Sequence, residues 1–316
     1  MARDTLRQNR EATTAPTAVV RVQPQSVALL VSLRPAQWTK NLILFAGLIF
    51  GGQLLDTASV GRASLGFAVF CLLSGVVYLI NDVQDVEADR QHPTKSRRPI
   101  AAGTLTPTTA LVSALVIGSV ALGCAWLLSV SFFLVAAAYV ALLSAYSVAL
   151  KHIVILDVLT IAAGFVLRAA AGAVVIGVAI SHWLLLVTLL GALFLALGKR
   201  RGELVTLAHG ATGHRRILAE YSAPLLDQLI TIVVSVTLLA YSFYTISPDT
   251  VANFGTQRLF FTFPFLLYGF FRYLYLIHQR QGGANPSETL ISDRPILVCV
   301  VLWACAVAVV IYGPWR

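Results

Sequence analysis

The sequence predicts an all-α polytopic membrane protein, and its composition and hydropathy lead to that fold class. Hydrophobic residues make up 58% of the 316 residues and charged residues only 12%, whereas charged residues are about a quarter of a soluble domain. Mean hydropathy is +0.80. The apolar residues form runs of helix length and do not alternate with polar residues, as they would in the strands of a membrane barrel.

Nine apolar segments account for most of the chain, and we expect each to form a transmembrane helix. The first is short, which favours a tilted or partly interfacial segment. The predicted segments are 41–55, 64–81, 108–128, 131–150, 155–178, 182–198, 226–246, 259–278 and 295–312.

The distribution of positive charge predicts the orientation. Nearly all Lys and Arg residues fall in the N-terminal tail and in alternate loops, which places those loops and the N-terminus in the cytoplasm. An odd number of spans leaves the C-terminus outside, in a multi-pass protein of the inner (plasma) membrane. The net charge of +9 forms no basic stripe with interleaved aromatic residues, so we expect no nucleic-acid partner. The loops assigned to the cytoplasm are 82–107, 151–154, 199–225 and 279–294.

Composition divides the chain into two parts. Residues 1–26 are polar and contain no apolar core of signal-peptide type, which predicts a disordered cytoplasmic tail. Residues 27–316 are expected to form a single integral-membrane catalytic domain. Whether the chain forms a homo-oligomer is left open.

An acidic stretch follows the second span. Three of the nine aspartates in the chain are Asp82, Asp85 and Asp89. At about 100° per residue they fall within a sector of roughly 60° on a helix, bordered by Asn81. Carboxylates on one face repel one another unless a cation neutralises them, and oxygen ligands suit Mg²⁺, which binds carboxylates together with substrate phosphates.

Basic side chains that suit anionic oxygens come directly after the acidic stretch, and the pair of features predicts a phosphorylated ligand held through metal. A solvated loop between two spans is the alternative, but the one-face spacing favours a site. The basic residues are Arg90, His92, Lys95 and Arg98.

Further candidates lie within the fifth span and at the cytoplasmic ends of other spans. Arg168 falls about 16 Å along the fifth span from Asp157 and shares its face, a depth at which an arginine is expected to serve function, or else to pair with that aspartate or with a buried carbonyl. Others fit either a phosphate site or anchoring to lipid headgroups. These are Arg34, Lys40, Asn41, Tyr146, Lys151, Lys199, Arg200, Arg201 and Glu203.

The pattern Asn81-Asp82-x-x-Asp85-x-x-x-Asp89 on nine spans resembles the UbiA superfamily of intramembrane prenyltransferases. The resemblance implies a nine-helix UbiA-like bundle in which the three aspartates chelate Mg²⁺ on a substrate diphosphate. Members generally carry a second motif of DxxxD type, and here the corresponding place has only Asp157, with Ile161 four residues on. This departure argues against ordinary prenyl transfer.

A finer set of motifs runs along the chain. They are Arg34-Pro35-x-Gln37-Trp38-x-Lys40-Asn41, Asp89-Arg90-x-His92-Pro93-x-Lys95-x-x-Arg98-Pro99-Ile100-Ala101-Ala102-Gly103, Tyr146-Ser147-x-x-Leu150-Lys151, Leu156-Asp157-Val158 and Leu197-Gly198-Lys199-Arg200-Arg201-x-Glu203. Together they resemble one branch of the superfamily. The resemblance implies transfer of 5-phosphoribosyl from phosphoribosyl diphosphate to a polyprenyl (decaprenyl) phosphate, with release of pyrophosphate, toward a lipid-linked arabinose donor for cell-wall arabinan.

Together these observations predict a site with assigned roles. The predicted catalytic residues are Asp82, Asp85, Asp89, Lys40 and Asp157, the first three also as metal ligands. The predicted substrate-binding residues are Asn81, Arg34, Asn41, Arg90, His92, Lys95, Arg98, Tyr146, Lys151, Arg168, Lys199, Arg200, Arg201 and Glu203. The alternatives are a UbiA-type prenyltransferase with an aromatic acceptor and a membrane transporter.

Overall fold

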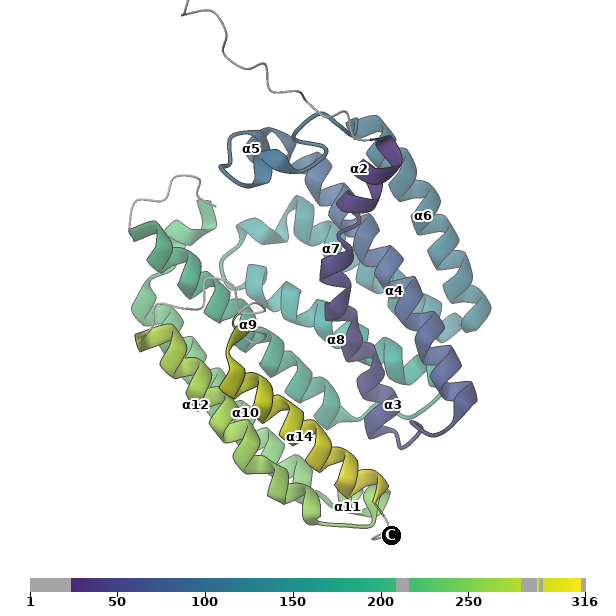
Figure 1. Cartoon of the computed structure of the whole chain (residues 1–316), viewed down its shortest axis with the longest axis vertical. Coiled ribbons are helices and arrows are strands. Elements are labelled where there is room, and N and C mark those ends of the chain that lie inside the picture. The colour runs from purple at the N-terminus through teal and green to yellow at the C-terminus, as the bar shows by residue number, and fades with distance from the viewer. Residues whose placement is uncertain (1–23, 209–215, 280–288, 290–291, 314–316) are drawn as a thin grey trace, which may run out of the picture.

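The fold is a bundle of long helices, seen in a computed structural model that describes residues 24–208, 216–279, 289 and 292–313. These residues form helices and connecting turns and contain no strand. Eight helical segments are long and apolar enough to cross a membrane, which confirms the predicted fold class (Figure 1). They are α4 (Thr57–Gln84), α6 (Pro107–Leu128), α7 (Val130–Val148), α8 (Leu156–Ile176), α9 (His182–Ala208), α10 (Ala223–Ile246), η5 with α12 (Arg258–Thr262 and Phe263–Gln279) and α14 (Arg294–Tyr312).

The first predicted span is not a regular α-helix. It consists of a 3₁₀ helix, η1 (Pro35–Phe45), followed by the short α3 (Ala46–Phe50). A 3₁₀ helix rises about 2.0 Å per residue, so the two together extend about 30 Å, the thickness of the hydrocarbon core. Figure 1 shows this purple segment running beside α4. Its far end reaches the end of α14, where the Tyr312 hydroxyl donates to Ile49 O at 2.7 Å.

Close backbone contact with α8 explains why this segment is irregular. A Cβ atom added to Gly172 would lie 1.8 Å from Leu44 O, and one added to Gly47 would lie 2.6 Å from Ala173 N. Two backbones approach this closely only where glycine leaves room. Gly172 of α8 and Gly47 of α3 therefore let η1 and α3 pack directly against α8.

Local sequence signals set where the long helices begin. Asp56 accepts from Ser59 N at 2.8 Å before α4, and Thr106, Ser129 and Ser222 cap α6, α7 and α10 in the same way. Such caps satisfy amide groups that have no partner within the helix. These four helices therefore begin one to seven residues before the segments predicted from hydropathy.

The N-terminal tail predicted for residues 1–26 lies almost wholly outside the described residues. Its end differs from the prediction, because α2 (Gln25–Ser32) already begins at Gln25. Ala28 of α2 is fully buried against α4 and α6, which explains the early start. The remaining short elements are α5 (Val86–Arg90), η2 (Lys95–Arg97), η3 (Leu150–His152), η4 (Arg216–Glu220) and α11 (Pro248–Phe254).

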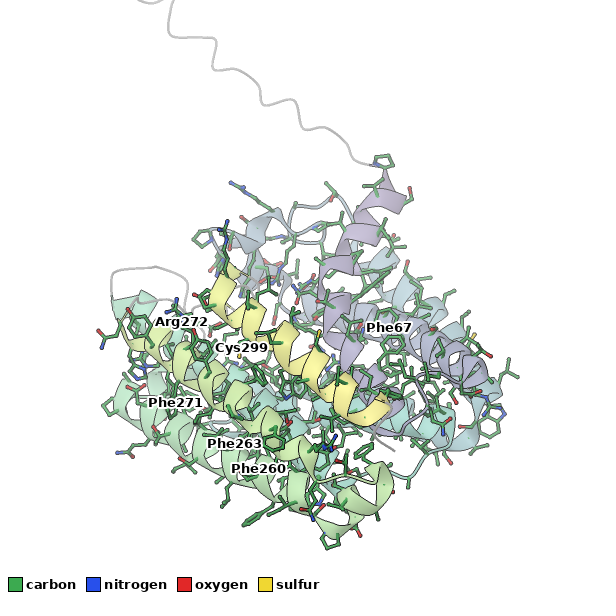
Figure 2. The ribbon with its side chains drawn as sticks, turned by 60° about the horizontal axis from the view of Figure 1, so that its bottom comes forward. Phe67, Phe260, Phe263, Phe271, Arg272 and Cys299 are labelled. Carbon is green, nitrogen blue, oxygen red and sulfur yellow. The ribbon has the colours of Figure 1, made fainter. Side chains whose placement is uncertain are left out.

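The bundle has two principal cores. One is shared by η1, α3, α4, α6, α7 and α8 around Phe70, Phe132 and Tyr139. The other is shared by α9, α10, α12 and α14, together with the start of α8. Figure 2 shows α12 and α14 side by side, where the Cys299 thiol of α14 donates to Phe265 O of α12 at 3.1 Å. The junction of the two cores lies along α8 and α9, which both carry predicted site residues.

Candidate active site at one end of the bundle

The acidic stretch lies where α4 ends. The helix stops at Gln84, and α5 begins at Val86. Hydrogen bonds of helical spacing continue across the junction, from Asp85 N to Asn81 O at 2.9 Å and from Asp89 N to Asp85 O at 2.8 Å. The break is therefore slight, and the helical spacing used for the prediction applies through Asp89.

Asp82 and Asp89 converge on one arginine. Arg98 Nη1 lies 3.1 Å from Asp82 Oδ1 and 2.6 Å from Asp89 Oδ2, and both carboxylates are nearly buried. Arg34 also pairs with Asp82 Oδ1. The loop that carries Arg98 is anchored by Ile100, which is 1% exposed. Packing of an apolar side chain thus fixes the position of a charged one.

Arg34 reaches this position through an unusual backbone conformation. It has φ of +52° and ψ of +64° and directly precedes Pro35 at the start of η1. The left-handed region is uncommon for a side chain of this size, so the contacts of Arg34 must hold it there. Its guanidinium lies 4.6 Å from the centre of the Tyr78 ring, a cation–π contact.

Asp85 has separate partners. Its Oδ1 accepts from Lys151 Nζ of η3 at 2.6 Å, and its Oδ2 accepts from Asn81 Nδ2 at 3.1 Å. Within the described ranges, no three His, Cys, Asp or Glu side chains form a group that could hold a metal ion. That all three aspartates share one metal therefore stays a prediction.

Two of the carboxylates nevertheless fit a divalent cation. Asp82 and Asp89 each place an oxygen within 3.1 Å of the same nitrogen, Arg98 Nη1, so a single positive centre already lies between them. Mg²⁺ usually takes one or two carboxylates and completes its shell with water and substrate phosphates. The donor set therefore suits such an ion without a third carboxylate.

Arg168 is a buried cation in the interior of the bundle. It is 5% exposed, and its guanidinium donates to Asn41 Oδ1 at 2.8 Å and to the Tyr139 hydroxyl at 2.7 Å. Asn41 in turn donates to Ser74 Oγ at 3.1 Å. No Asp or Glu among the described residues pairs with Arg168. The alternative that it pairs with Asp157 is thus wrong, because Arg200 has taken that carboxylate.

Two lysines add positive charge near Arg168. Lys40 of η1 lies within electrostatic range of Arg168, Lys199 and Arg34, and it forms no ion pair within the described part of the chain. Lys199 Nζ lies 3.9 Å from Glu203 Oε1, a long separation for an ion pair. Arg168 and Lys40 are therefore two cations with no carboxylate partner among the described residues, which favours an anionic ligand.

Asp157 is the centre of another buried network. It is fully buried, its Oδ2 accepts from Arg200 Nε at 2.7 Å, and its Oδ1 accepts from the Tyr221 hydroxyl at 2.6 Å. Arg200 also pairs with Glu203 at 2.8 Å. Burial and the hydrogen bond to Asp157 raise the pKa of Tyr221 to about 12, which keeps the phenol protonated as a donor.

The other predicted residues of this loop have side-chain partners other than the paired aspartates. Arg90 is exposed and pairs with Glu87 at 2.7 Å. The His92 ring accepts from Thr94 N at 3.2 Å, and burial together with the Lys95 cation lowers the pKa of His92. In these positions His92 and Lys95 form one edge of the site.

Two predicted residues have neighbours or partners on α9, α10 and α12. Tyr146 lies near Arg200. Arg201 pairs with Asp227 of α10 and donates to Ile277 O of α12 at 3.1 Å. These contacts make Arg201 a link between helices.

Sequence reasoning missed three tyrosines that contact the predicted site residues. Tyr78 faces Arg34, Tyr139 accepts from Arg168, and Tyr221 donates to Asp157. No sequence signal separates Tyr78 and Tyr139 from ordinary aromatic residues in apolar spans. Tyr221 follows a basic loop, but its partner lies 64 residues away.

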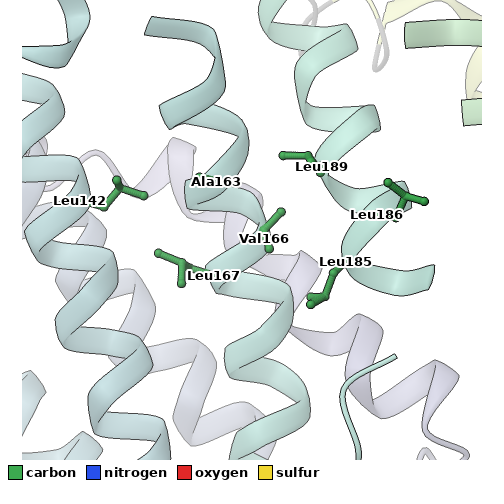
Figure 3. A pocket seen from close by; sticks show the side chains of 7 residues that line it. All are labelled: Leu142, Ala163, Val166, Leu167, Leu185, Leu186 and Leu189. Carbon is green, nitrogen blue, oxygen red and sulfur yellow. The ribbon is translucent and has the colours of Figure 1, made fainter. Parts of the chain in front are cut away.

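An apolar groove lies between α7, α8 and α9 (Figure 3). Its volume is about 390 Å³. None of its lining residues is polar, so it suits hydrocarbon and cannot bind a diphosphate. The lining residues are Leu142, Ala163, Val166, Leu167, Leu185, Leu186 and Leu189.

Comparison with known proteins gives close relatives along most of the chain. The decaprenyl-phosphate phosphoribosyltransferase of Corynebacterium glutamicum is 32% identical over 305 residues, which cover 92% of this chain and 90% of that enzyme. The enzyme of the same name from Mycobacterium tuberculosis is 33% identical over 291 residues, covering 89% and 94%. That from Mycolicibacterium smegmatis is 34% identical over 295 residues, covering 90% and 92%.

Solved structures share the fold at lower sequence identity. A UbiA homologue from Archaeoglobus fulgidus bound to GPP and Mg²⁺ has a TM-score of 0.68 and 18% identity, covering 90% of this chain and 99% of that one. The same homologue has also been solved with Cd²⁺, at a TM-score of 0.66 and 16% identity, again covering 90% and 99%. The model of the UbiA prenyltransferase family matches residues 42–292. This chain is therefore a multi-span integral membrane protein that belongs to the UbiA prenyltransferase family.

Proposed function

We propose that this protein transfers 5-phosphoribosyl from phosphoribosyl diphosphate to a polyprenyl phosphate and releases pyrophosphate. The observation that carries the proposal is the division of the charged side chains of the site into two groups. Arg34, Arg98 and Lys151 are paired with Asp82, Asp89 and Asp85. Arg168 and Lys40 have no carboxylate partner within the described ranges. A reaction between two phosphorylated substrates needs two such groups.

The paired group suits the donor diphosphate. Asp82 and Asp89, with Asp85 beside them, are the residues that would hold Mg²⁺, and Arg34, Arg98 and Lys151 would bind phosphate oxygens. When bound, the ion would neutralise the negative charge that develops on the departing diphosphate. The arginines and the lysine stabilise the same charge from fixed positions.

The unpaired group suits the acceptor phosphate. The bond from C1 of the ribose to the diphosphate oxygen breaks, and an oxygen of the lipid phosphate forms the new bond to C1. The lipid phosphate is ionised at neutral pH, so its attacking oxygen carries no proton that a strong base must remove. Arg168 and Lys40 therefore orient the acceptor, with Lys199 close to Lys40, and the apolar helix faces and the groove accommodate its hydrocarbon chain.

The remaining substrate contacts belong to the edge of the site. Arg90, His92 and Lys95 lie in the loop that follows the acidic stretch, where they contact the donor as it enters from the cytoplasm.

We place the protein in the plasma membrane with its N-terminus inside and its C-terminus outside, because the site and most of the positive charge share one end of the bundle. The product is suited to synthesis of a lipid-linked arabinose donor.

A transfer assay tests the activity. Purified protein is incubated in lipid with Mg²⁺, phosphoribosyl diphosphate labelled in the ribose, and a polyprenyl phosphate. We expect label in the lipid phase, its loss when a chelator removes the metal, and its return when Mg²⁺ is added in excess. A folded protein that leaves the lipid unlabelled contradicts the proposal. Release of pyrophosphate from a prenyl diphosphate with an aromatic acceptor would instead support ordinary prenyl transfer.

Replacing Arg168 with leucine tests the acceptor group. We expect KM for the polyprenyl phosphate to rise about 10- to 100-fold, since a charge-assisted hydrogen bond to phosphate contributes about 1.5–3 kcal/mol. Insertion into the membrane should be at least as efficient as in the parent protein, because the substitution removes an arginine that at this depth costs about 2.5–3.5 kcal/mol on insertion scales. The exposed Arg62 provides a control for loss of one positive charge. If Arg168→Leu has the KM and kcat of the parent enzyme, Arg168 does not bind the acceptor.

A further inference from the structure

The turn that leads into α8 is strained. Ile155 has φ of +69° and ψ of −44°. The Leu156 N–H donates to Val154 O at 2.8 Å, across a single residue, which defines a γ-turn of the uncommon positive-φ form. A β-branched residue is a genuine outlier at positive φ. Such strain persists only where the surrounding structure holds it.

The Tyr221 hydroxyl holds this turn. It accepts from Ile155 N at 2.8 Å and donates to Asp157 Oδ1 at 2.6 Å. Arg200 Nε fixes the other carboxylate oxygen of Asp157 at 2.7 Å, so the carboxylate cannot turn away. Tyr221 is itself 5% exposed within the core formed by α9, α10, α12 and α14. A side chain from the core formed by α9, α10, α12 and α14 therefore fixes the turn that connects η3 to α8.

The same turn sets the position of Lys151. Lys151 belongs to η3, four residues before Ile155, and its Nζ donates to Asp85 Oδ1 at 2.6 Å. Asp157 N donates to Ile153 O at 3.0 Å, and this hydrogen bond keeps the turn close to η3. A shift of the turn would therefore withdraw Lys151 from the acidic stretch.

We infer that Tyr221 is a positioning residue: it holds the strained turn at Ile155 and thereby keeps Lys151 at Asp85, without touching a substrate. The inference rests on the proposed function, in which Lys151 binds a donor phosphate. The role of Asp157 and Arg200 is then to hold the Tyr221 hydroxyl in place. The single carboxylate that remains of the second acidic motif thus acts through the protein and not on the substrate.

The matched variants are Tyr221→Phe and Tyr273→Phe. Both remove one hydroxyl from a buried tyrosine of the same core. The Tyr273 hydroxyl has no hydrogen-bond partner in the described part of the chain, so its loss should leave the turn intact. In the absence of substrate and metal, we expect faster amide exchange over residues 150–157 in Tyr221→Phe only. Equal exchange in the two variants would overturn the inference.

Kinetics then test whether Tyr221 acts through Lys151. Tyr221→Phe should lower kcat/KM for phosphoribosyl diphosphate about tenfold, mainly through KM for the donor, whereas Tyr273→Phe should leave it unchanged. In a Lys151→Ala background, Tyr221→Phe should add almost nothing, because the lysine it positions is gone. A tenfold loss that persists in that background would overturn the inference. If the parent enzyme transfers no label, the proposed function fails, and amide exchange decides on the turn by itself.

Discussion

Asp82→Asn is expected to abolish transfer, with a fall in kcat of about 10²- to 10³-fold or more, the size found when one preorganised electrostatic group is removed. Asp82 is 2% exposed and pairs with both Arg34 and Arg98. Asparagine keeps the shape but removes the charge that balances the two arginines and that would bind a cation. Transfer of label from donor to lipid measures the effect.

The matched control for this substitution is Glu87→Gln. Glu87 lies in the same acidic stretch, its side chain is 77% exposed, and its partner is the exposed Arg90. Exposed ion pairs contribute about 0–1 kcal/mol, so the control should keep both its fold and its activity. If Asp82→Asn turns over as fast as Glu87→Gln, the charge of Asp82 is not used in the reaction.

Gly172→Ala is expected to destabilise the bundle strongly. The added Cβ would lie 1.8 Å from Leu44 O. The α8 backbone fixes the position of the Cβ and Leu44 O belongs to the η1 backbone, so neither atom can rotate away and η1 must move from α8. Overpacking of this kind costs about 1–3 kcal/mol and more where nothing can yield. The melting temperature in a fixed detergent should fall by at least about 5 °C.

The same substitution should reduce activity, because η1 also carries Asn41, which accepts from Arg168 of α8 at 2.8 Å. Gly123→Ala on α6 is the control, since a Cβ there meets nothing within 4 Å. Alanine in an open helical position stabilises by about 0.5–1 kcal/mol relative to glycine. If both variants melt at the temperature of the parent protein, η1 does not rest on Gly172.

Most of the fold could be predicted from hydropathy. Eight of the nine predicted segments are long apolar helices, because burial of backbone groups in lipid admits few other structures. The exception is the segment 41–55, whose irregular conformation cannot be predicted from the hydropathy of its own residues. Its geometry depends on Gly172, more than 100 residues later in the chain.

The candidate site could be predicted in part. Helical periodicity grouped Asp82 with Asp89, and the structure brings both to Arg98. The partner of Asp85 could not be predicted this way, because Lys151 is distant in sequence and reaches Asp85 through a separate turn. For Arg168, depth in the span predicted a buried cation but not its partners, Asn41 and Tyr139.

The sequence by itself determined that this protein is a helical membrane bundle with an acidic face at the end of its second span. Periodicity and hydropathy are properties of neighbouring residues, so they can be read without a structure. Only the tertiary structure decided which cation neutralises each carboxylate and which cations remain without one. The ion pairs of Asp82, Asp85 and Asp89 join residues 9 to 66 positions apart, and the packing of whole helices sets the distances between them.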